Sequence, residues 1–471
     1  MIKKEELLKK KIALITLGCD KNTVDAEKMM YLLSNYGFKF VSDVSQANIA
    51  IVNTCAFILD SKTESVNKIL EVSAYKNQNL EKLIVTGCLP QRYYDEVEKS
   101  IPEIDALVRL KNNDKIVDII CGLFGVLESF KIKTKAPNRV LSTPSHYAFL
   151  KIADGCNNFC SYCTIPFIRG RFKSTPMECL IEEAKALAKN GVKELILVAQ
   201  DVTKYGTDLY GSPQLVSLIK ELSKIKKIEW IRLHYCYPNL ITDELLNEIE
   251  TNPKVCKYLD IPLQHISNNI LKNMNRKDTA EDIKFLLTKI KNLSKPISIR
   301  STFIVGFPGE TRKDVQELIN FLQTFKLDNV GFFTYSREEN TKAAKMKNQV
   351  PEFIKKHRLK KVQTVQQQIL QENQKNKIGK IYRAICDELD GENYIFRTEG
   401  NSVSVDTICL VKSKKPLTVG EFYNIKIIAI NQIDLIAEIF EWGGKYEHSK
   451  QTFFNKNNSC ATNDGGFYVA I

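Results

Sequence analysis

The feature that most restricts the fold is an alternation of short apolar runs with segments of helical pattern, repeated six times in the middle of the chain. Continuous apolar runs are typical of strands buried on both faces, and helical segments between them favour right-handed crossovers into a parallel sheet. Six βα units are too few to close an eight-stranded barrel, so the pattern predicts a partial (β/α)6 barrel. The predicted strands cover residues 148–153, 194–200, 230–236, 258–264, 297–306 and 329–336.

A shorter alternation of the same kind precedes this region. Apolar runs at 12–17, 48–52 and 82–86 are separated by helical patterns at about 25–35 and 61–73. This βαβαβ order predicts an α/β domain with a doubly wound parallel sheet. A polar stretch with Pro and Asn, at 131–145, is interpreted as the linker to the next domain.

The last third of the chain has a different pattern. Residues 345–380 are helical in pattern and strongly basic, and short β-rich runs at turn-separated spacing follow from 381 to 441. These runs predict a small five-strand antiparallel β-barrel. The predicted divisions are an N-terminal domain at 11–130, a central domain at 145–342, a basic helical connector at 343–380, the barrel at 381–442 and a tail at 443–471.

The composition of the chain indicates which cell compartment and which kind of chemistry to expect. A chain of 471 residues is expected to form about two to four domains. No apolar stretch approaches the ~20 residues that span a bilayer, and the start lacks a signal peptide, so a cytoplasmic protein is expected. Thirteen cysteines in such a chain argue against a disulfide framework and favour metal or cluster binding.

The strongest local signal is a loop with three cysteines directly after the first of the six strands. Cys156, Cys160 and Cys163 have the spacing C-x3-C-x2-C. Three thiolates can bind three irons of a four-iron four-sulfur cube and leave the fourth iron open, because no fourth cysteine lies nearby in the sequence. A zinc site or three packed thiols is the alternative, but structural zinc sites favour paired knuckles with four ligands. The spacing therefore favours an iron-sulfur cluster.

Three further cysteines, far apart in the sequence, share one context. Cys19, Cys55 and Cys88 each follow an apolar run of the N-terminal region by one to three residues. Ligands of open parallel sheets bind outside the carboxyl ends of the strands, so the three thiols are expected to converge. For any single cysteine, burial in the core is the simpler explanation. Repetition at three strand ends favours a second cluster.

The cysteine loop resembles that of the radical S-adenosylmethionine (SAM) superfamily. In that family SAM chelates the open iron, and one electron cleaves it to a 5′-deoxyadenosyl radical, so the resemblance implies cofactor-driven radical chemistry. Two further segments resemble motifs that line the SAM pocket, although each alone is equally consistent with an ordinary strand-end turn. Their residues are Gln200 and Asp201 after the second strand, and Gly306, Gly309 and Glu310 after the fifth.

The three-cysteine domain and the radical SAM motif together resemble the methylthiotransferase family from about Lys11 to Glu441, and the final barrel resembles a TRAM domain. The resemblance implies two 4Fe-4S clusters and two uses of SAM: one molecule donates a methyl group and another generates the radical. It implies a SAM-binding cluster on the cysteine loop and an auxiliary cluster that binds the sulfur to be inserted. The implied ligands are Cys156, Cys160 and Cys163 for the first and Cys19, Cys55 and Cys88 for the second.

Within this family the sequence resembles the RimO type, which modifies the β-carbon of an aspartate in small-subunit ribosomal protein twelve. Residues 18–25 follow L-G-C-P-K-N-x-V-D and residues 258–265 follow Y-L-D-I-P-L-Q-H, whereas segments 165–170 and 335–341 follow I-P-x-I-R-G and Y-S-x-E-E-G-T. The MiaB type, which modifies a tRNA adenosine, is the alternative activity. A catalytically inactive iron-sulfur factor that binds the ribosome is the alternative of another class, and the intact cysteine loop argues against it.

The distribution of charge along the chain indicates which partners to expect. Residues 380–442 contain seven Lys and Arg and ten Asp and Glu, so the predicted barrel is acidic within a chain of net charge +13. An RNA-binding barrel would be basic, whereas an acidic one suits a basic ribosomal protein, with a solvated surface as the simpler alternative. The resemblance also implies a reductant such as flavodoxin or ferredoxin. The chain departs from the family at Asp20, where the pattern has Pro, and over 396–406.

Basic residues outside the cysteine sets have their own predicted roles. Arg169 and Arg171 follow the cysteine loop closely enough to meet the carboxylate of SAM or an acidic substrate, and Arg169 is a candidate cofactor ligand. The basic run at 355–361 is interpreted as a solvated helix face, with contact to ribosomal RNA as the alternative. His234 and His265 are interpreted as satisfied polar side chains at strand ends.

Overall fold

The structure is a computed structural model that describes residues 2–126 and 139–441. It divides into two compact units, one up to residue 370 and one from residue 371. The predicted tail at 443–471 and most of the predicted linker lie outside the described residues. The finer division into five segments stays a prediction. Among the described residues, no helix combines the length and the apolar character needed to cross a membrane.

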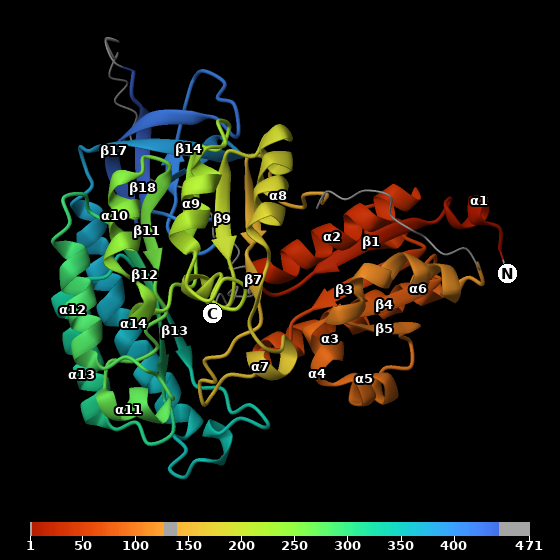
Figure 1. Cartoon of the computed structure of the whole chain (residues 1–471), viewed down its shortest axis with the longest axis horizontal. Helices are drawn as coiled ribbons and strands as arrows, with labels where there is room; N and C mark the ends of the chain where they lie inside the picture. The colour runs from red at the N-terminus through yellow and green to blue at the C-terminus, as the bar shows by residue number, and fades with distance from the viewer. Residues whose placement is uncertain (1, 127–138, 442–471) are drawn as a thin grey trace. The chain divides into compact units, whose positions relative to one another are not determined.

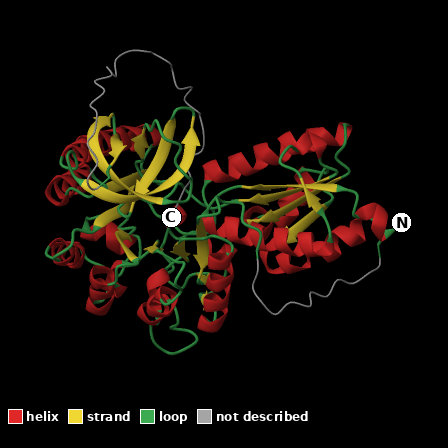
Figure 2. Ribbon diagram, turned by 90° about the horizontal axis from the view of Figure 1, so that it is seen from above, coloured by secondary structure: helices red, strands yellow, loops and turns green. Residues whose placement is uncertain are grey.

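The first part of the larger unit is a five-stranded parallel sheet in the order β2-β1-β3-β4-β5. Alternate residues of its strands face opposite sides, so that Ile49 and Ile51 pack with α2 and α6, whereas Ala50 and Val52 pack with α3 and α5. Helices therefore cover both faces, as predicted (Figure 2). The strands are β1 (Lys11–Thr16), β2 (Lys39–Phe40), β3 (Ile49–Thr54), β4 (Lys82–Gly87) and β5 (Ala106–Arg109), and the helices are α1 (Lys4–Leu7), α2 (Asp20–Tyr36), α3 (Leu59–Ser73), α4 (Cys88–Arg92), α5 (Tyr94–Ser100) and α6 (Ile116–Leu123).

The second part of this unit contains the six predicted strands as one parallel sheet, in the order β13-β12-β11-β10-β9-β6 (Figure 1). Neighbours in the sheet are successive along the chain, with helices as crossovers, which is the expected partial (β/α)6 arrangement. The strands are β6 (Tyr147–Lys151), β9 (Glu194–Val198), β10 (Trp230–Leu233), β11 (Val255–Asp260), β12 (Ser298–Val305) and β13 (Asn329–Thr334), with a small hairpin of β7 (Ala153–Asp154) and β8 (Lys173–Ser174).

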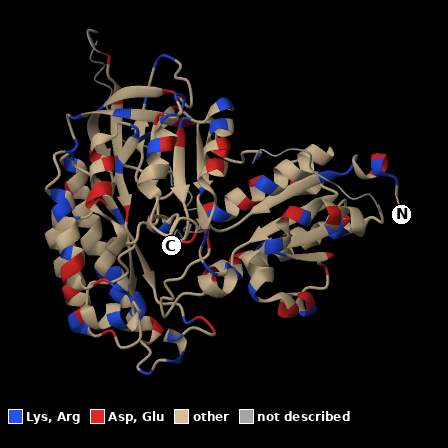
Figure 3. Cartoon of the chain, in the orientation of Figure 1, with Lys and Arg blue, Asp and Glu red and all other residues tan. Residues whose placement is uncertain are grey.

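The helices of this part begin and end at recognisable signals. Thr311 caps α13 and exchanges hydrogen bonds with Asp314, a capping box that satisfies N–H groups of the first turn. Figure 3 shows charged positions mostly on helices and loops, whereas the strands are largely uncharged, which accounts for the apolar runs in the sequence. The helices are α7 (Ile165–Ile168), α8 (Met177–Lys189), α9 (Leu215–Ser223), α10 (Asp243–Thr251), α11 (Asn268–Asn273), α12 (Ala280–Lys291), α13 (Arg312–Phe325) and α14 (Glu352–Lys375).

The smaller unit contains a closed five-stranded barrel, in the order β14-β15-β16-β18-β17. The prediction of a wholly antiparallel barrel is wrong in one respect, because β16 and β18 pair in parallel. A ring of five strands cannot alternate in direction throughout, so at least one neighbouring pair has to be parallel. The strands are β14 (Ile381–Asp390), β15 (Asn393–Thr398), β16 (Cys409–Val411), β17 (Phe422–Asn431) and β18 (Asp434–Ile439).

Short 3₁₀ turns connect several of these elements. They are η1 (Val44–Gln46), η2 (Ala74–Asn77), η3 (Leu110–Lys115), η4 (Val202–Lys204), η5 (Pro238–Leu240) and η6 (Ala343–Lys345).

Candidate functional site

The structure brings together the carboxyl ends of three neighbouring strands, β1, β3 and β4, and each carries one of the three distant cysteines. Cys19 is the N-cap of α2, Cys55 follows β3 directly, and Cys88 begins α4. A Cβ atom on Gly18 would lie 2.7 Å from Cys55 Cβ and 3.1 Å from Cys55 Sγ, so only glycine allows the Cys19 loop to approach so closely. The predicted convergence is therefore present in the fold.

Asn22, on the first turn of α2, ties these three loops together. Its side-chain amide donates to the carbonyl oxygens of Leu17 (2.9 Å) and Thr54 (3.0 Å). Its Oδ1 lies 3.8 Å from Cys88 Sγ, within reach of the weak thiol donor. The Asn53 side chain in turn donates to the Asn22 carbonyl oxygen at 2.8 Å. Asn22 belongs to the family pattern, but its role as the link between loops could not be read from the sequence.

Two cysteines of this set, Cys55 and Cys88, are buried, whereas Cys19 is partly exposed. Burial, together with the nearby Cys19, raises the pKa of Cys55. Burial also raises the pKa of Cys88 to about 12, although the Arg169 guanidinium works in the opposite direction. Such thiols hold their protons in the absence of a cation, and a metal that binds them has to displace those protons.

The second set of cysteines lies on the loop between β7 and α7, as the sequence predicted. The Asn158 N–H donates to Cys156 Sγ at 3.4 Å, and the Cys163 N–H donates to the Cys160 carbonyl oxygen at 3.1 Å. Ser161 anchors the loop to the end of α11 through a hydroxyl that donates to the Asn273 carbonyl oxygen at 2.7 Å. Burial and the neighbouring Cys160 together raise the pKa of Cys156 to about 11, although the Asn158 N–H works in the opposite direction.

The predicted SAM-pocket residues after β9 hold this loop in place. Asp201 is fully buried and accepts hydrogen bonds from the Asn158 side chain (3.0 Å) and the Thr203 hydroxyl (2.5 Å). The Gln200 side-chain amide donates to Asp154 Oδ1 at 3.2 Å, just before the cysteine loop. Both residues thus contact the segment that presents the cysteines.

The predicted residues after β12 form a separate group. Glu310 accepts from the Gly306 N–H (2.8 Å) and from Arg358 of α14 (2.8 Å), and it lies 3.5 Å from His265 Nε2. Gly309 has a φ of +83°, and no heavy atom lies within 4 Å of the Cβ position that a side chain there would occupy. Phe307, between the two glycines, packs edge-on against Tyr162 of the cysteine loop, with ring centroids 6.4 Å apart. Phe307 and Tyr162 belong to one apolar cluster, and Cys160 and Cys163 pack against it.

The basic run at 355–361 is not a uniformly solvated face, so that interpretation is wrong in part. Lys355 is 3% exposed and donates to the Tyr335 carbonyl oxygen at 2.8 Å. Its side chain fills the space beside Gly306, where a Cβ atom would lie 2.3 Å from Lys355 Cγ. Arg358 pairs with Glu310, whereas Lys360 is exposed.

The segment after β10 contacts residues that flank each cysteine set. Lys21 Nζ lies 3.4 Å from the centroid of the Tyr235 ring, and Lys204, which contacts Asn158 of the cysteine loop, lies 6.0 Å from the centroid of the Tyr237 ring. Burial raises the pKa of Tyr235, and the negative groups that raise it further include Asp20 and Cys19. Burial also raises the pKa of Tyr237, and there one contributing neighbour is Cys160. One short segment of the central domain therefore contacts the surroundings of both sets.

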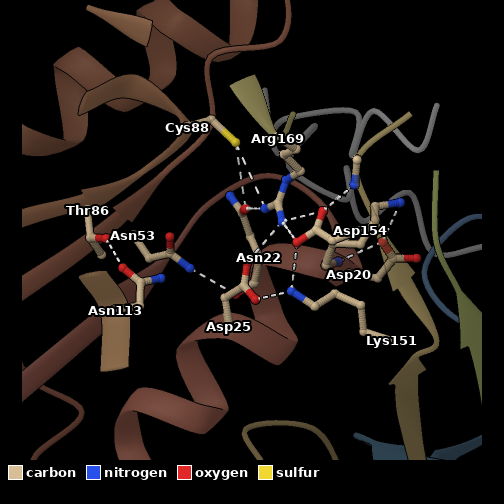
Figure 4. A network of polar contacts seen from close by, with 12 residues as sticks. Asp20, Asn22, Asp25, Asn53, Thr86, Cys88, Asn113, Lys151, Asp154 and Arg169 are labelled. Atoms are coloured by element: carbon tan, nitrogen blue, oxygen red, sulfur yellow. Dashed lines mark hydrogen bonds and ion pairs between the residues drawn. The ribbon is translucent and has the colours of Figure 1, made fainter. Parts of the chain in front are cut away.

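Arg169 connects the two parts of the larger unit (Figure 4). Its guanidinium donates to Asp25 Oδ2 (3.0 Å), Asp154 Oδ2 (2.9 Å) and Asn22 Oδ1 (2.5 Å), and it lies 4.0 Å from Cys88 Sγ. Lys151 contacts the same two carboxylates. Burial alone would lower the pKa of Arg169, but Asp154 and Asp25 outweigh it and raise it well above its usual value. The described partners of Arg169 thus come from both sides of the site, with Asn22 and Asp25 on α2 and Asp154 just before the cysteine loop.

Comparison with known proteins agrees with this geometry. Residues 150–322 match the radical SAM superfamily, residues 11–109 match uncharacterized protein family UPF0004, and residues 378–440 match the TRAM domain. A ribosomal protein uS12 methylthiotransferase RimO from Acetivibrio thermocellus is 45% identical over 453 residues, which is 93% of this chain and 100% of the relative. The enzyme of the same name from Clostridium botulinum is 46% identical over 441 residues, 92% of this chain and 99% of that one.

The chain belongs to this RimO family of methylthiotransferases. The predicted family, enzyme class and α/β fold with a terminal barrel are confirmed. Among solved structures, the radical SAM methyltransferase TsrM from Kitasatospora setae, with cobalamin and a [4Fe-4S] cluster bound, matches with a TM-score of 0.53 at 13% identity. That match covers 71% of this chain and 77% of TsrM, and it shows a shared fold.

The cofactors of this radical SAM family are SAM and two four-iron clusters, and the residues present fit them. Each cysteine set offers three thiols, which are soft donors suited to iron, and three ligands leave one iron of a cube open. In residues 2–126 and 139–441, no three His, Cys, Asp or Glu side chains surround one point as ligands of a single metal ion would. A cube takes one thiolate per iron, so its cysteines stand further apart than the ligands of one ion.

Proposed function

We propose that this chain transfers a methylthio group to the β-carbon of an aspartate in small-subunit ribosomal protein uS12. The relatives that carry this name match 92–93% of the chain and 99–100% of their own length. The observation that carries the proposal is the presence of two three-cysteine sets whose flanking residues contact each other. The Thr164 hydroxyl, next to Cys163, lies 3.4 Å from the Phe57 carbonyl oxygen, and Arg169 reaches Asn22 Oδ1 at 2.5 Å and lies 4.0 Å from Cys88 Sγ. A reaction that combines a sulfur carrier with a radical source needs the two groups close to each other.

The proposed ligands are those expected from the sequence. Each set is supported by its position at strand ends. In the auxiliary set Cys55 and Cys88 are also buried. When bound, the clusters and SAM would supply a hydrogen-abstracting radical and the sulfur to be inserted. The SAM-binding cluster is assigned to Cys156, Cys160 and Cys163, and the auxiliary cluster to Cys19, Cys55 and Cys88.

The chain's own residues would orient these groups and exclude water. Tyr162, Phe307 and Tyr335 form an apolar cluster against which Cys160 and Cys163 pack. A dry site of this kind limits side reactions of a radical and strengthens the electrostatic contacts inside it.

The SAM contacts remain proposals of unequal support. Gln200 and Asp201 are supported by their contacts with the cysteine loop and its preceding residue Asp154. Gly306, Gly309 and Glu310 are proposed on the resemblance and on their place at the carboxyl end of β12. For Arg169, whose described partners are Asp25, Asp154 and Asn22, SAM binding stays a prediction.

The remaining partners follow from the proposed reaction. We propose that the acidic TRAM-like barrel contacts the basic ribosomal protein, free or on the ribosome, because opposite charge favours this encounter. We further propose a flavodoxin or ferredoxin as the electron donor, and the cytoplasm, where ribosomes work, as the compartment.

Mass spectrometry of ribosomal proteins and digested tRNA, from cells with and without the gene, tests the reaction. We expect the methylthio group to disappear from an aspartate of uS12 when the gene is removed. Its disappearance from a tRNA adenosine alone would instead support the MiaB type of activity. No change in either product would contradict both activities and favour a binding factor.

Two single-cysteine variants test the assignment of the clusters. We expect Cys19→Ala to lose the auxiliary iron while it still cleaves SAM, and Cys160→Ala to lose SAM cleavage. Iron content and release of 5′-deoxyadenosine are the two readouts, and Cys179→Ala, which removes an exposed cysteine outside both sets, is the control. Equal loss of SAM cleavage in the first two variants would contradict separate roles.

A further inference from the structure

Lys21 is a buried cation beside the auxiliary cysteine set. It lies on the first turn of α2, two residues after Cys19, and only 4% of its surface is exposed. Its Nζ lies 2.8 Å from Asp20 Oδ1 and 3.4 Å from the centroid of the Tyr235 ring. An ammonium group has three N–H donors, and a buried charge is costly unless it is paired and hydrogen-bonded. Yet among the described residues, the Nζ has no hydrogen-bond partner of acceptable geometry.

Its position is defined from both parts of the larger unit. Tyr235 belongs to the segment after β10 and has a φ of +60°, an uncommon value for a non-glycine residue. Its ring contacts Lys21 through a cation–π interaction. Two residues later, the Tyr237 ring lies 6.0 Å from Lys204 Nζ, which contacts Asn158 of the cysteine loop. The Lys21 ammonium thus lies at the auxiliary end of a segment whose other end faces the cysteine loop.

Asp20, which replaces the Pro of the family pattern, holds Lys21 from the other side. Asp20 Oδ1 forms an ion pair with Lys21 Nζ at 2.8 Å. Asp20 Oδ2 also lies 3.8 Å from His234 Nδ1. The carboxylate is therefore shared between two bases and leaves donors of Lys21 without an acceptor.

The other cations near the two sets already have acceptors. Arg169 and Lys151 share the carboxylates of Asp25 and Asp154. Lys204 contacts the Asn158 side chain of the cysteine loop. In the described part of the chain, Lys21 is the buried lysine whose Nζ lacks a hydrogen-bond partner.

We propose that Lys21 Nζ binds the side-chain carboxylate of the substrate aspartate and so positions its β-carbon between the two cysteine sets. This inference rests on the proposed function, in which that aspartate is the substrate. An ammonium–carboxylate hydrogen bond is charge-assisted, and it would give Lys21 a well-aligned acceptor in addition to its ion pair with Asp20. The carboxylate of SAM has the same chemistry, but Lys21 lies beside Cys19, away from the loop assigned to SAM.

Binding of uS12 to the cluster-loaded full chain, with SAM but no reductant, tests the proposal without turnover. The two ligands are uS12 with its target aspartate and uS12 with asparagine in its place. We expect the wild type to bind the aspartate form about 10- to 100-fold more tightly, since hydrogen bonds to charged groups contribute in this range. Lys21→Met should bind both forms with equal affinity, and Lys21→Arg should restore part of the preference.

Lys28→Met is the matched control. Lys28 lies on the same helix, its side chain is 42% exposed, and its ion-pair partner is Glu183 at 3.7 Å, so this variant should keep the wild-type preference. Lys21→Gln provides a second test if Lys21→Met fails to load iron, and it should also lose most of the preference.

Two results would overturn the proposal. The first is a Lys21→Met enzyme that still prefers the aspartate form of uS12. The second is a Lys21→Met enzyme that keeps this preference but binds SAM more weakly, which would assign the Lys21 ammonium to SAM. Methylthiolation by the wild type, measured separately with reductant, distinguishes this failure from failure of the proposed function. If the wild type modifies uS12 but the Lys21 variants keep the binding preference, the proposed function is supported and the proposed role of Lys21 is wrong.

Discussion

Replacement of Arg169 by Gln is expected to loosen the contact between the auxiliary domain and the central domain. The Arg169 side chain is 2% exposed and pairs with Asp25 at 3.0 Å and with Asp154 at 2.9 Å. Without it, two carboxylates share the single ammonium of Lys151. Removal of one partner from a buried ion network costs about 3–5 kcal/mol, because uncompensated charge stays buried.

Hydrogen exchange of the loaded enzyme measures this loss locally. The Asn22 amide, bonded to the Cys19 carbonyl oxygen at 2.9 Å, and the Gly155 amide, bonded to Asp154 Oδ1 at 3.0 Å, report the two sides of the network. Since 1.4 kcal/mol is a factor of ten, their exchange should become about 100- to several thousand-fold faster. Amides of the barrel should not change.

Arg171→Gln is the control for this prediction. Arg171 is two residues away but exposed, with its guanidinium over the Phe159 ring at 5.1 Å. It should alter exchange at Asn22 by less than about threefold, as expected for an exposed charge that contributes little. Equal acceleration by the two variants, or none in Arg169→Gln, would refute the role given to the network.

Two further substitutions have distinct expected outcomes. Gly87 has a φ of +97°, and a Cβ atom there would lie 2.3 Å from a backbone oxygen of the adjacent strand. Gly87→Ala should therefore lose auxiliary iron but keep SAM cleavage. The control is Gly122→Ala, which should keep both because a Cβ atom there has no neighbour within 4 Å. Glu338 is 2% exposed and accepts from two cations, so Glu338→Gln should lower the free energy of unfolding by about 1.5–3 kcal/mol in denaturant titrations. Glu339→Gln, at a side chain 58% exposed, should cost at most about 1 kcal/mol, and equal costs would contradict this assignment.

The strands and the convergence of three cysteines could be predicted because each depends on a local pattern. A parallel strand buried on both faces is a continuous apolar run, so all six strands of the central sheet were identifiable. Cys19, Cys55 and Cys88 lie one to three residues beyond such runs, and neighbouring parallel strands end at one edge. The short edge strands β2 and β5 carry too few residues for a periodic signal.

No local sequence pattern indicated the contacts that join the domains. Asp25 and Arg169 are 144 residues apart, and neither has a neighbour in sequence that indicates the other. The same holds for Lys21 and Tyr235, which come from different domains. The burial of Lys355 was missed because a charged residue in a basic helical run is usually solvated, whereas here the side chain fills the space left by Gly306.

The most direct test of the central claim is mass spectrometry of uS12 after incubation of the purified, cluster-loaded chain with small ribosomal subunits, SAM and a reductant. The account predicts a methylthio group on one aspartate of uS12, formed by the wild type and by neither Cys19→Ala nor Cys160→Ala. Unmodified uS12 alongside full SAM cleavage, or a product formed equally well by Cys19→Ala, would contradict it.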